Sequence, residues 1–130
     1  MSRKAEREMM MKMIFQMDAQ NDFGQEIYDT FIMLNDKSEI TDYFRNTYKN
    51  IVEHIDEIDA KIESNSIKWK LSRLPKVDLA ILRVSAAEIL YDENIPVSVS
   101  INEAVMLAKN YSTDKSSKFI NGLLGNLAKM

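Results

Sequence analysis

The chain has 130 residues, of which 45% are hydrophobic and 28% are charged, and its formal net charge is −3. This length and hydrophobic content exclude a disordered chain and suit one globular domain, which we expect to span residues 1–130. The chain has no cysteine, so disulfides and thiolate metal sites are excluded. No apolar run is long enough for a signal peptide or a membrane span, and we therefore expect a cytoplasmic protein without membrane contact.

Charge is distributed unevenly along the chain. Residues 1–17 hold four basic and two acidic residues. Residues 18–64 hold four basic and twelve acidic residues, and residues 65–130 hold nine basic and six acidic residues. The negative total argues against indiscriminate binding to nucleic acid. Any surface that binds anions must therefore be built from the two ends of the chain.

The first predicted helix covers residues 3–18. One side of it is apolar at ~100° per residue, formed by Met9, Met10, Met13, Ile14 and Met17. An adjoining arc carries Arg3, Lys4 and Arg7, with Phe15 beside it. The helix is therefore expected to pack one face and to present a basic arc.

The middle of the chain is predicted to contain a short helix and a long one. The short helix covers residues 25–34 and is followed by a polar loop at residues 35–38. The long helix runs from about residue 39 to residue 62, because apolar residues recur there every three or four positions. We expect the other helices to pack around this segment.

A third region, residues 69–91, begins with Trp69 and Leu71 alternating with lysines. This alternation is too short for a strand and is followed by Pro75, which suits the first position of a helix reaching about Tyr91. If the ring of Trp69 is buried, replacing it with alanine should cost ~3–5 kcal/mol.

Two helices with a polar break between them are predicted for the C-terminal third. Ser100 and Glu103 have the spacing of a capping box, so a helix is expected to begin at Ser100, with Val99 and Ala104 as its hydrophobic staple. The break lies at residues 112–114. A second apolar stripe follows, formed by Ile120, Leu123, Leu124 and Leu127. The sequence thus predicts an all-α fold: a compact bundle of about six or seven helices with no strand.

The sequence offers little support for catalysis. His54 is the only histidine, and it lies between acidic residues on a predicted helix, where it needs no function. There is no pair of histidines at helical spacing, no glycine-rich phosphate loop and no nucleophile elbow. We expect no enzymatic activity, no cofactor and no metal site.

Two segments have the chemistry to bind RNA, although each has a simpler explanation. The arc of Arg3, Lys4 and Arg7 could contact phosphates, or could be a solvated helix start. Lys118 and Phe119 pair a cation with an aromatic ring on which an unpaired base can stack, but Phe119 could equally be a core residue.

Two blocks of residues resemble the NusB family of RNA-binding transcription antitermination factors. The C-terminal block consists of Ile101, Asn102, Glu103, Ala104, Leu107, Ala108, Lys109, Lys118, Phe119, Asn121, Gly122 and Leu124. The upstream block consists of Trp69, Leu71, Arg73, Leu74, Val77, Asp78, Ile81, Leu82 and Arg83. The specific resemblance covers about residues 58–125 and is looser over residues 1–57. In the C-terminal block, Gly122 is expected to permit the close approach of another helix.

The resemblance implies a NusB-like fold and a function in transcription antitermination. It implies three partners: the boxA element of ribosomal RNA transcripts, the small-subunit ribosomal protein NusE, and the antitermination complex of RNA polymerase. The implied RNA-binding residues are Arg3, Lys4, Arg7, Phe15, Lys115, Lys118 and Phe119. Asp78 is implied as a partner-binding residue; without the resemblance, Asp78 and Arg83 would be interpreted as surface charges or as an intrahelical pair. We expect a monomer or a weak homodimer when the protein is free.

Two other functions remain open from the sequence. NusB-like domains also occur as accessory RNA-binding domains of ribosomal RNA methyltransferases, although this chain has no glycine-rich cofactor segment. The chain could also be a purely helical interaction scaffold. In addition, Glu6 and Glu8 dilute the positive charge of the first helix.

Overall fold

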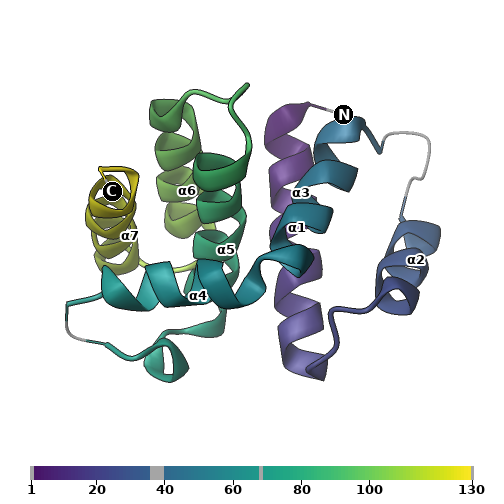
Figure 1. Cartoon of the computed structure of the whole chain (residues 1–130), viewed down its shortest axis with the longest axis horizontal. Helices are drawn as coiled ribbons and strands as arrows, with labels where there is room; N and C mark the ends of the chain where they lie inside the picture. Colours follow the sequence, from purple (N-terminus) through teal and green to yellow (C-terminus); the bar gives the residue numbers. More distant parts are fainter. Residues whose placement is uncertain (1, 36–39, 68, 130) are drawn as a thin grey trace.

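A computed structural model describes residues 2–35, 40–67 and 69–129 of the protein. These residues form seven α-helices and one 3₁₀ turn, with no strand among them (Figure 1), which confirms the predicted all-α fold. The helices are α1 (Arg3–Gln20), α2 (Gln25–Leu34), α3 (Asp42–Glu53), α4 (Ile55–Ser64), α5 (Lys76–Tyr91), α6 (Val97–Tyr111) and α7 (Asp114–Ala128), and the 3₁₀ turn is Leu71–Arg73. Of the polar loop expected at residues 35–38, only Asn35 lies within the described residues.

Helix α5 is the centre of the bundle, and it packs against α1, α3, α4, α6 and α7. Residues 78–88 are buried without interruption, so this helix has no solvent-facing side over three turns. A helix that is covered on all sides is expected where several others surround it. The expectation that the segment at residues 39–62 forms the centre is therefore wrong.

That segment is also not one helix. Helix α3 ends at Glu53 and α4 begins at Ile55, and in Figure 1 the two run in different directions. The chain bends at His54, whose φ of −124° and ψ of 22° lie outside the α-helical region. The His54 ring stacks on Tyr91 with 4.1 Å between ring centres. The apolar spacing continues through the bend because both helices turn their isoleucines towards the same core.

The predicted capping box at Ser100 is also wrong. Helix α6 begins three residues earlier, at Val97 after Pro96, and the backbone N–H of Ser100 already donates to the carbonyl of Pro96 at 3.2 Å. The Ser100 side chain is buried, and its hydroxyl donates to Oε1 of Glu88 at 2.8 Å. Ser100 thus donates to a buried carboxylate in a charge-assisted hydrogen bond, and it does not cap the start of a helix.

Helix α2 has the predicted bounds. The break before α7 is one residue shorter than predicted: it ends at Thr113, whose hydroxyl accepts from the Ser116 N–H at 2.9 Å, and Asp114 is already helical. The apolar faces of α1 and α7 are buried as expected. Pro75 precedes α5 by one residue instead of being its first.

Glu88 joins four helices through one buried carboxylate. Arg7 of α1 donates to both of its oxygens, from Nε at 2.9 Å and from Nη2 at 3.0 Å. Tyr43 of α3 donates its hydroxyl at 2.6 Å, and Ser100 of α6 also donates its hydroxyl. Burial and the charge of Glu88 raise the pKa of Tyr43, so its hydroxyl remains a donor. The expectation that Arg7 lies on an exposed arc is wrong, because only 5% of its surface is exposed.

Arg83 is the second buried arginine. Its guanidinium donates to both carboxylate oxygens of Asp59, each at 2.9 Å, and its Nη1 lies 3.5 Å from Asp18. Arg83 therefore ties α5 to α1 and α4 and is neither a surface charge nor a partner of Asp78. Among the described residues, no helix is long and apolar enough to cross a membrane.

Candidate nucleic-acid interface

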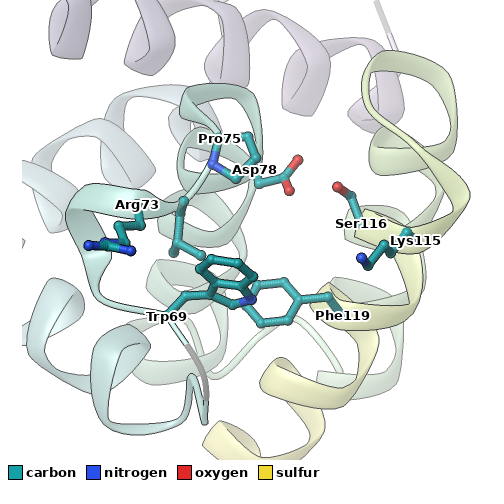
Figure 2. A pocket seen from close by; sticks show the side chains of 8 residues that line it. Trp69, Arg73, Pro75, Asp78, Lys115, Ser116 and Phe119 are labelled. Carbon is teal, nitrogen blue, oxygen red and sulfur yellow. The ribbon is translucent and has the colours of Figure 1, made fainter.

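A hollow of about 260 Å³ lies where the start of α7 faces the segment that leads into α5. We call it the Trp69–Phe119 hollow. Figure 2 shows its lining residues: Trp69, Arg73, Leu74, Pro75, Asp78, Lys115, Ser116 and Phe119. Its wall thus combines two large aromatic rings with two cationic side chains.

The start of α7 supplies one wall of this hollow. Thr113 caps the helix, and Lys115 and Phe119 are then one turn apart on the same face. Phe119 is half-buried and packs partly against the core, while Lys115 is exposed. Phe119 is therefore both a packing residue and a surface ring, and the two alternatives open from the sequence do not exclude each other.

Trp69 supplies the opposite wall, from the segment before the 3₁₀ turn. Its side chain is 46% exposed, so the ring is not a core residue. The backbone beyond it is held by Glu63 of α4, whose carboxylate accepts from the Leu71 N–H at 2.8 Å. The large stability loss for Trp69→Ala was expected only if the ring is buried, and it therefore no longer applies.

Trp69 and Phe119 also line a second hollow of about 290 Å³. Ile67, Lys118 and Gly122 of α7 contribute to its lining. The two rings thus belong to both hollows. Gly122 is exposed here, and a Cβ atom at this position would meet nothing within 4 Å. The expectation that Gly122 permits the close approach of another helix is therefore wrong.

Asp78 forms part of the floor of the Trp69–Phe119 hollow. It lies in the first turn of α5 and is 2% exposed. Its Oδ1 accepts from the Ser112 hydroxyl at 2.7 Å, and in Figure 2 its carboxylate points towards Ser116. The interpretation of Asp78 as a surface charge is wrong, and a partner can reach it only through the hollow.

Three of the four residues expected on α1 are exposed. Lys4 is exposed, and Phe15 is 38% exposed. Arg3 is also exposed, but its guanidinium lies 4.3 Å from the centre of the Tyr43 ring and 3.7 Å from Glu6. The fourth, Arg7, is buried on Glu88 and does not reach the surface.

Sequence reasoning missed a cluster between α1 and the end of α6, which we call the α1–α6 cluster: Glu8, Lys12 and Tyr111. Oε1 of Glu8 accepts from Lys12 Nζ at 3.3 Å and also from the Tyr111 hydroxyl, while Lys12 Nζ lies 5.4 Å from the centre of the Tyr111 ring. The hydrogen bond from Tyr111 is the main cause that lowers the pKa of Glu8. The four-residue spacing of Glu8 and Lys12 was visible in the sequence, but the contact with residue 111 was not.

This cluster adjoins the Trp69–Phe119 hollow through the chain itself. Tyr111 is followed by Ser112, which binds Asp78 on the floor of the hollow. Exposed lysines and half-exposed aromatic rings therefore extend from α1 to α7. A flexible polyanion with flat, stackable groups fits such a surface, because cations bind its phosphates and rings stack on its bases.

Comparison with known proteins gives a consistent result. The family model described as the NusB family matches residues 4–129. A relative from Thermoanaerobacter sp. (strain X514), named transcription antitermination protein NusB, is 48% identical over 96% of this chain and 89% of its own length. A solved structure of T. maritima NusB is similar with a TM-score of 0.88 at 32% identity, over 99% of this chain and 92% of that one. A second, described as antitermination factors NusB and NusE in complex with dsRNA, has a TM-score of 0.82 at 25% identity, over 98% of this chain and 96% of that one. The sequence resemblance is confirmed, and the chain belongs to the NusB family.

Proposed function

We propose that this protein is a non-enzymatic transcription antitermination factor that binds the boxA element of ribosomal RNA transcripts together with NusE. The observation that carries the proposal is the Trp69–Phe119 hollow, where two accessible rings lie beside Lys115 and Arg73. The name of the Thermoanaerobacter relative and the description of the complex with NusE and RNA support it. The setting we propose is the antitermination complex of RNA polymerase.

Within this proposal, the residues divide into two chemical roles. Phe119 and Trp69 offer faces on which unpaired bases stack, which is how proteins commonly hold single-stranded RNA. Lys115, Lys118, Lys4 and Arg3 contact phosphates, and Phe15 adds a ring on α1. Arg7 is removed from this set and instead fixes the position of α1.

The proposal includes a partner because the cations of this surface are few and are interspersed with acids. The chain carries a net charge of −3, so tight binding to RNA is better achieved when a second protein extends the same surface. We place NusE at the edge of the hollow that contains Asp78. The free protein remains a monomer or a weak homodimer in this proposal.

The single tryptophan provides a direct test. Trp69 lies in the proposed site, so stacking of a base should change its fluorescence. Titration with a short boxA RNA should quench the emission, and added NusE should shift the midpoint to lower RNA concentration. A scrambled RNA of equal length is the control. Equal affinity for both RNAs in the presence of NusE, or no binding to either, would contradict the proposal.

A further inference from the structure

The α1–α6 cluster has a geometry that its structural role does not require. Two donors from different helices, the ammonium of Lys12 and the hydroxyl of Tyr111, converge on a single oxygen of Glu8. The cluster is open to solvent, with exposed fractions of 54% for the Lys12 side chain, 37% for the Glu8 side chain and 39% for Tyr111. Exposed ion pairs of this kind contribute little to folding stability.

We propose that Lys12 and Tyr111 form a binding position for an RNA phosphate, which the carboxylate of Glu8 occupies in the free protein. The inference rests on the proposed function and adds to it a contact and an internal competitor. A phosphate oxygen and a carboxylate oxygen are both anionic acceptors, and they suit the same ammonium and hydroxyl donors.

The location of the cluster supports this assignment. Tyr111 is the last residue of α6, and Ser112 after it contacts Asp78 in the floor of the Trp69–Phe119 hollow. An RNA strand that leaves the hollow towards α1 would therefore meet Tyr111 and, beside it, Lys12.

Charge explains why Glu8 weakens this contact. The lowered pKa of Glu8 means that its carboxylate is ionised at neutral pH, so it neutralises Lys12 before RNA arrives. An incoming phosphate must displace Glu8 and then remains close to its negative charge. The parent protein consequently gains little from Lys12, whereas a variant without the Glu8 charge gains a full phosphate contact.

The test is a double-mutant cycle on RNA affinity, measured with boxA RNA and NusE over a range of salt concentrations. Glu8→Gln keeps the shape of the side chain and removes its charge. It should tighten binding about fivefold at 0.1 M salt and steepen the salt slope by ~0.7, the value of one single-strand phosphate. Lys12→Gln should weaken binding by the parent about twofold, and in the Glu8→Gln background it should also remove the whole gain.

A matched control removes the same charge elsewhere. Glu93 is exposed in the connection before α6, at the opposite end of this helix of 15 residues, or ~22 Å from Tyr111. Glu93→Gln should leave affinity within about twofold of the parent. Urea unfolding of each variant checks that the fold is intact.

Two results would overturn the inference and leave the proposed function standing. If Glu8→Gln and Glu93→Gln tighten binding equally, overall charge accounts for the gain. If Lys12→Gln weakens binding equally in both backgrounds, Glu8 does not occupy the phosphate position. Failure of the parent protein to bind RNA with NusE would instead overturn the proposed function, and this inference with it.

Discussion

Arg7 was expected to lie on an exposed arc, but in the structure it is buried against Glu88. Both are buried, and each satisfies the charge of the other through paired hydrogen bonds. Arg7→Met should lower the free energy of unfolding by ~3–5 kcal/mol, because it leaves the Glu88 carboxylate buried without its countercharge. Urea unfolding measures this loss, and Lys4→Met, at an exposed position on the same helix, should stay within about 0.5 kcal/mol of the parent. A small loss for Arg7→Met would mean that Arg7 is free to contact RNA.

Phe119 and Lys115, one turn apart on α7, should separate stacking from charge. Phe119→Ala should weaken RNA binding in the presence of NusE by ~1–3 kcal/mol and leave the salt slope unchanged, because a stacked base releases no counterion. Lys115→Gln should make the slope shallower by ~0.7. Thermal unfolding of both variants is needed alongside, since Phe119 also packs against the core. Normal binding by a folded Phe119→Ala protein would remove the stacking role.

The partial exposure of Trp69 predicts how much Trp69→Ala lowers the free energy of unfolding. Its ring is 46% exposed, so Trp69→Ala should cost clearly less than the ~3–5 kcal/mol of a fully buried aromatic ring. A urea unfolding curve measures the difference. A loss in the full range would place the ring in the core in solution and weaken its assignment to the hollow.

Among the helices, α7 contains a position where the sequence is not optimal for stability. A Cβ atom at Gly125 would meet nothing within 4 Å, so no packing or backbone requirement in the described structure demands glycine there. Gly125→Ala should stabilise the protein by ~0.5–1 kcal/mol, because alanine loses less conformational entropy in a helix. An unchanged or lower unfolding midpoint would show that this position needs glycine for another reason.

Apolar periodicity predicted most helices of this protein but not how they are joined. It located α1, α2 and α7 because each has one buried face. It failed at His54, because a bend between two helices that face one core leaves the spacing of isoleucines intact. It also could not assign Arg7, whose acceptor lies 81 residues away. The sequence around each residue does not reveal a pair so distant along the chain. Charged residues in α1 and α5 were therefore interpreted as surface residues.

The candidate site was predictable where its residues are adjacent in sequence. Lys118 and Phe119 form a visible pair, and Lys115 lies one turn before Phe119. The hollow itself was not predictable, since its other wall comes from Trp69, fifty residues earlier and outside any long helix. The α1–α6 cluster was missed for the same reason, because Tyr111 acquires its role only when α6 ends beside α1.

For the whole molecule, the tyrosines predict how stability depends on pH. All five have a pKa raised above its usual value, by burial in most cases and by the Glu8 hydrogen bond at Tyr111. The folded state therefore keeps protons that the unfolded state releases near pH 10, and this contribution to stability is complete below that pH and is lost as pH rises above it. For buried Tyr43 the slope reaches ~1.4 kcal/mol per pH unit. Urea unfolding between pH 9 and pH 11 should show one cooperative transition whose midpoint falls as the pH rises. A constant midpoint would contradict the burial of Tyr43.

The link between Arg7 and Glu88 also has a consequence for the order of events during translation. At ~5–20 residues per second, a ribosome makes Arg7 some ~4–16 s before it makes an acceptor 81 residues later. Helix α1 is thus the first to be synthesised and cannot dock fully until α5 exists to receive it. Of the helices that α1 packs against, only α2 and α3 are complete during this interval. The larger contact with α5 forms only after more than two thirds of the protein has been made.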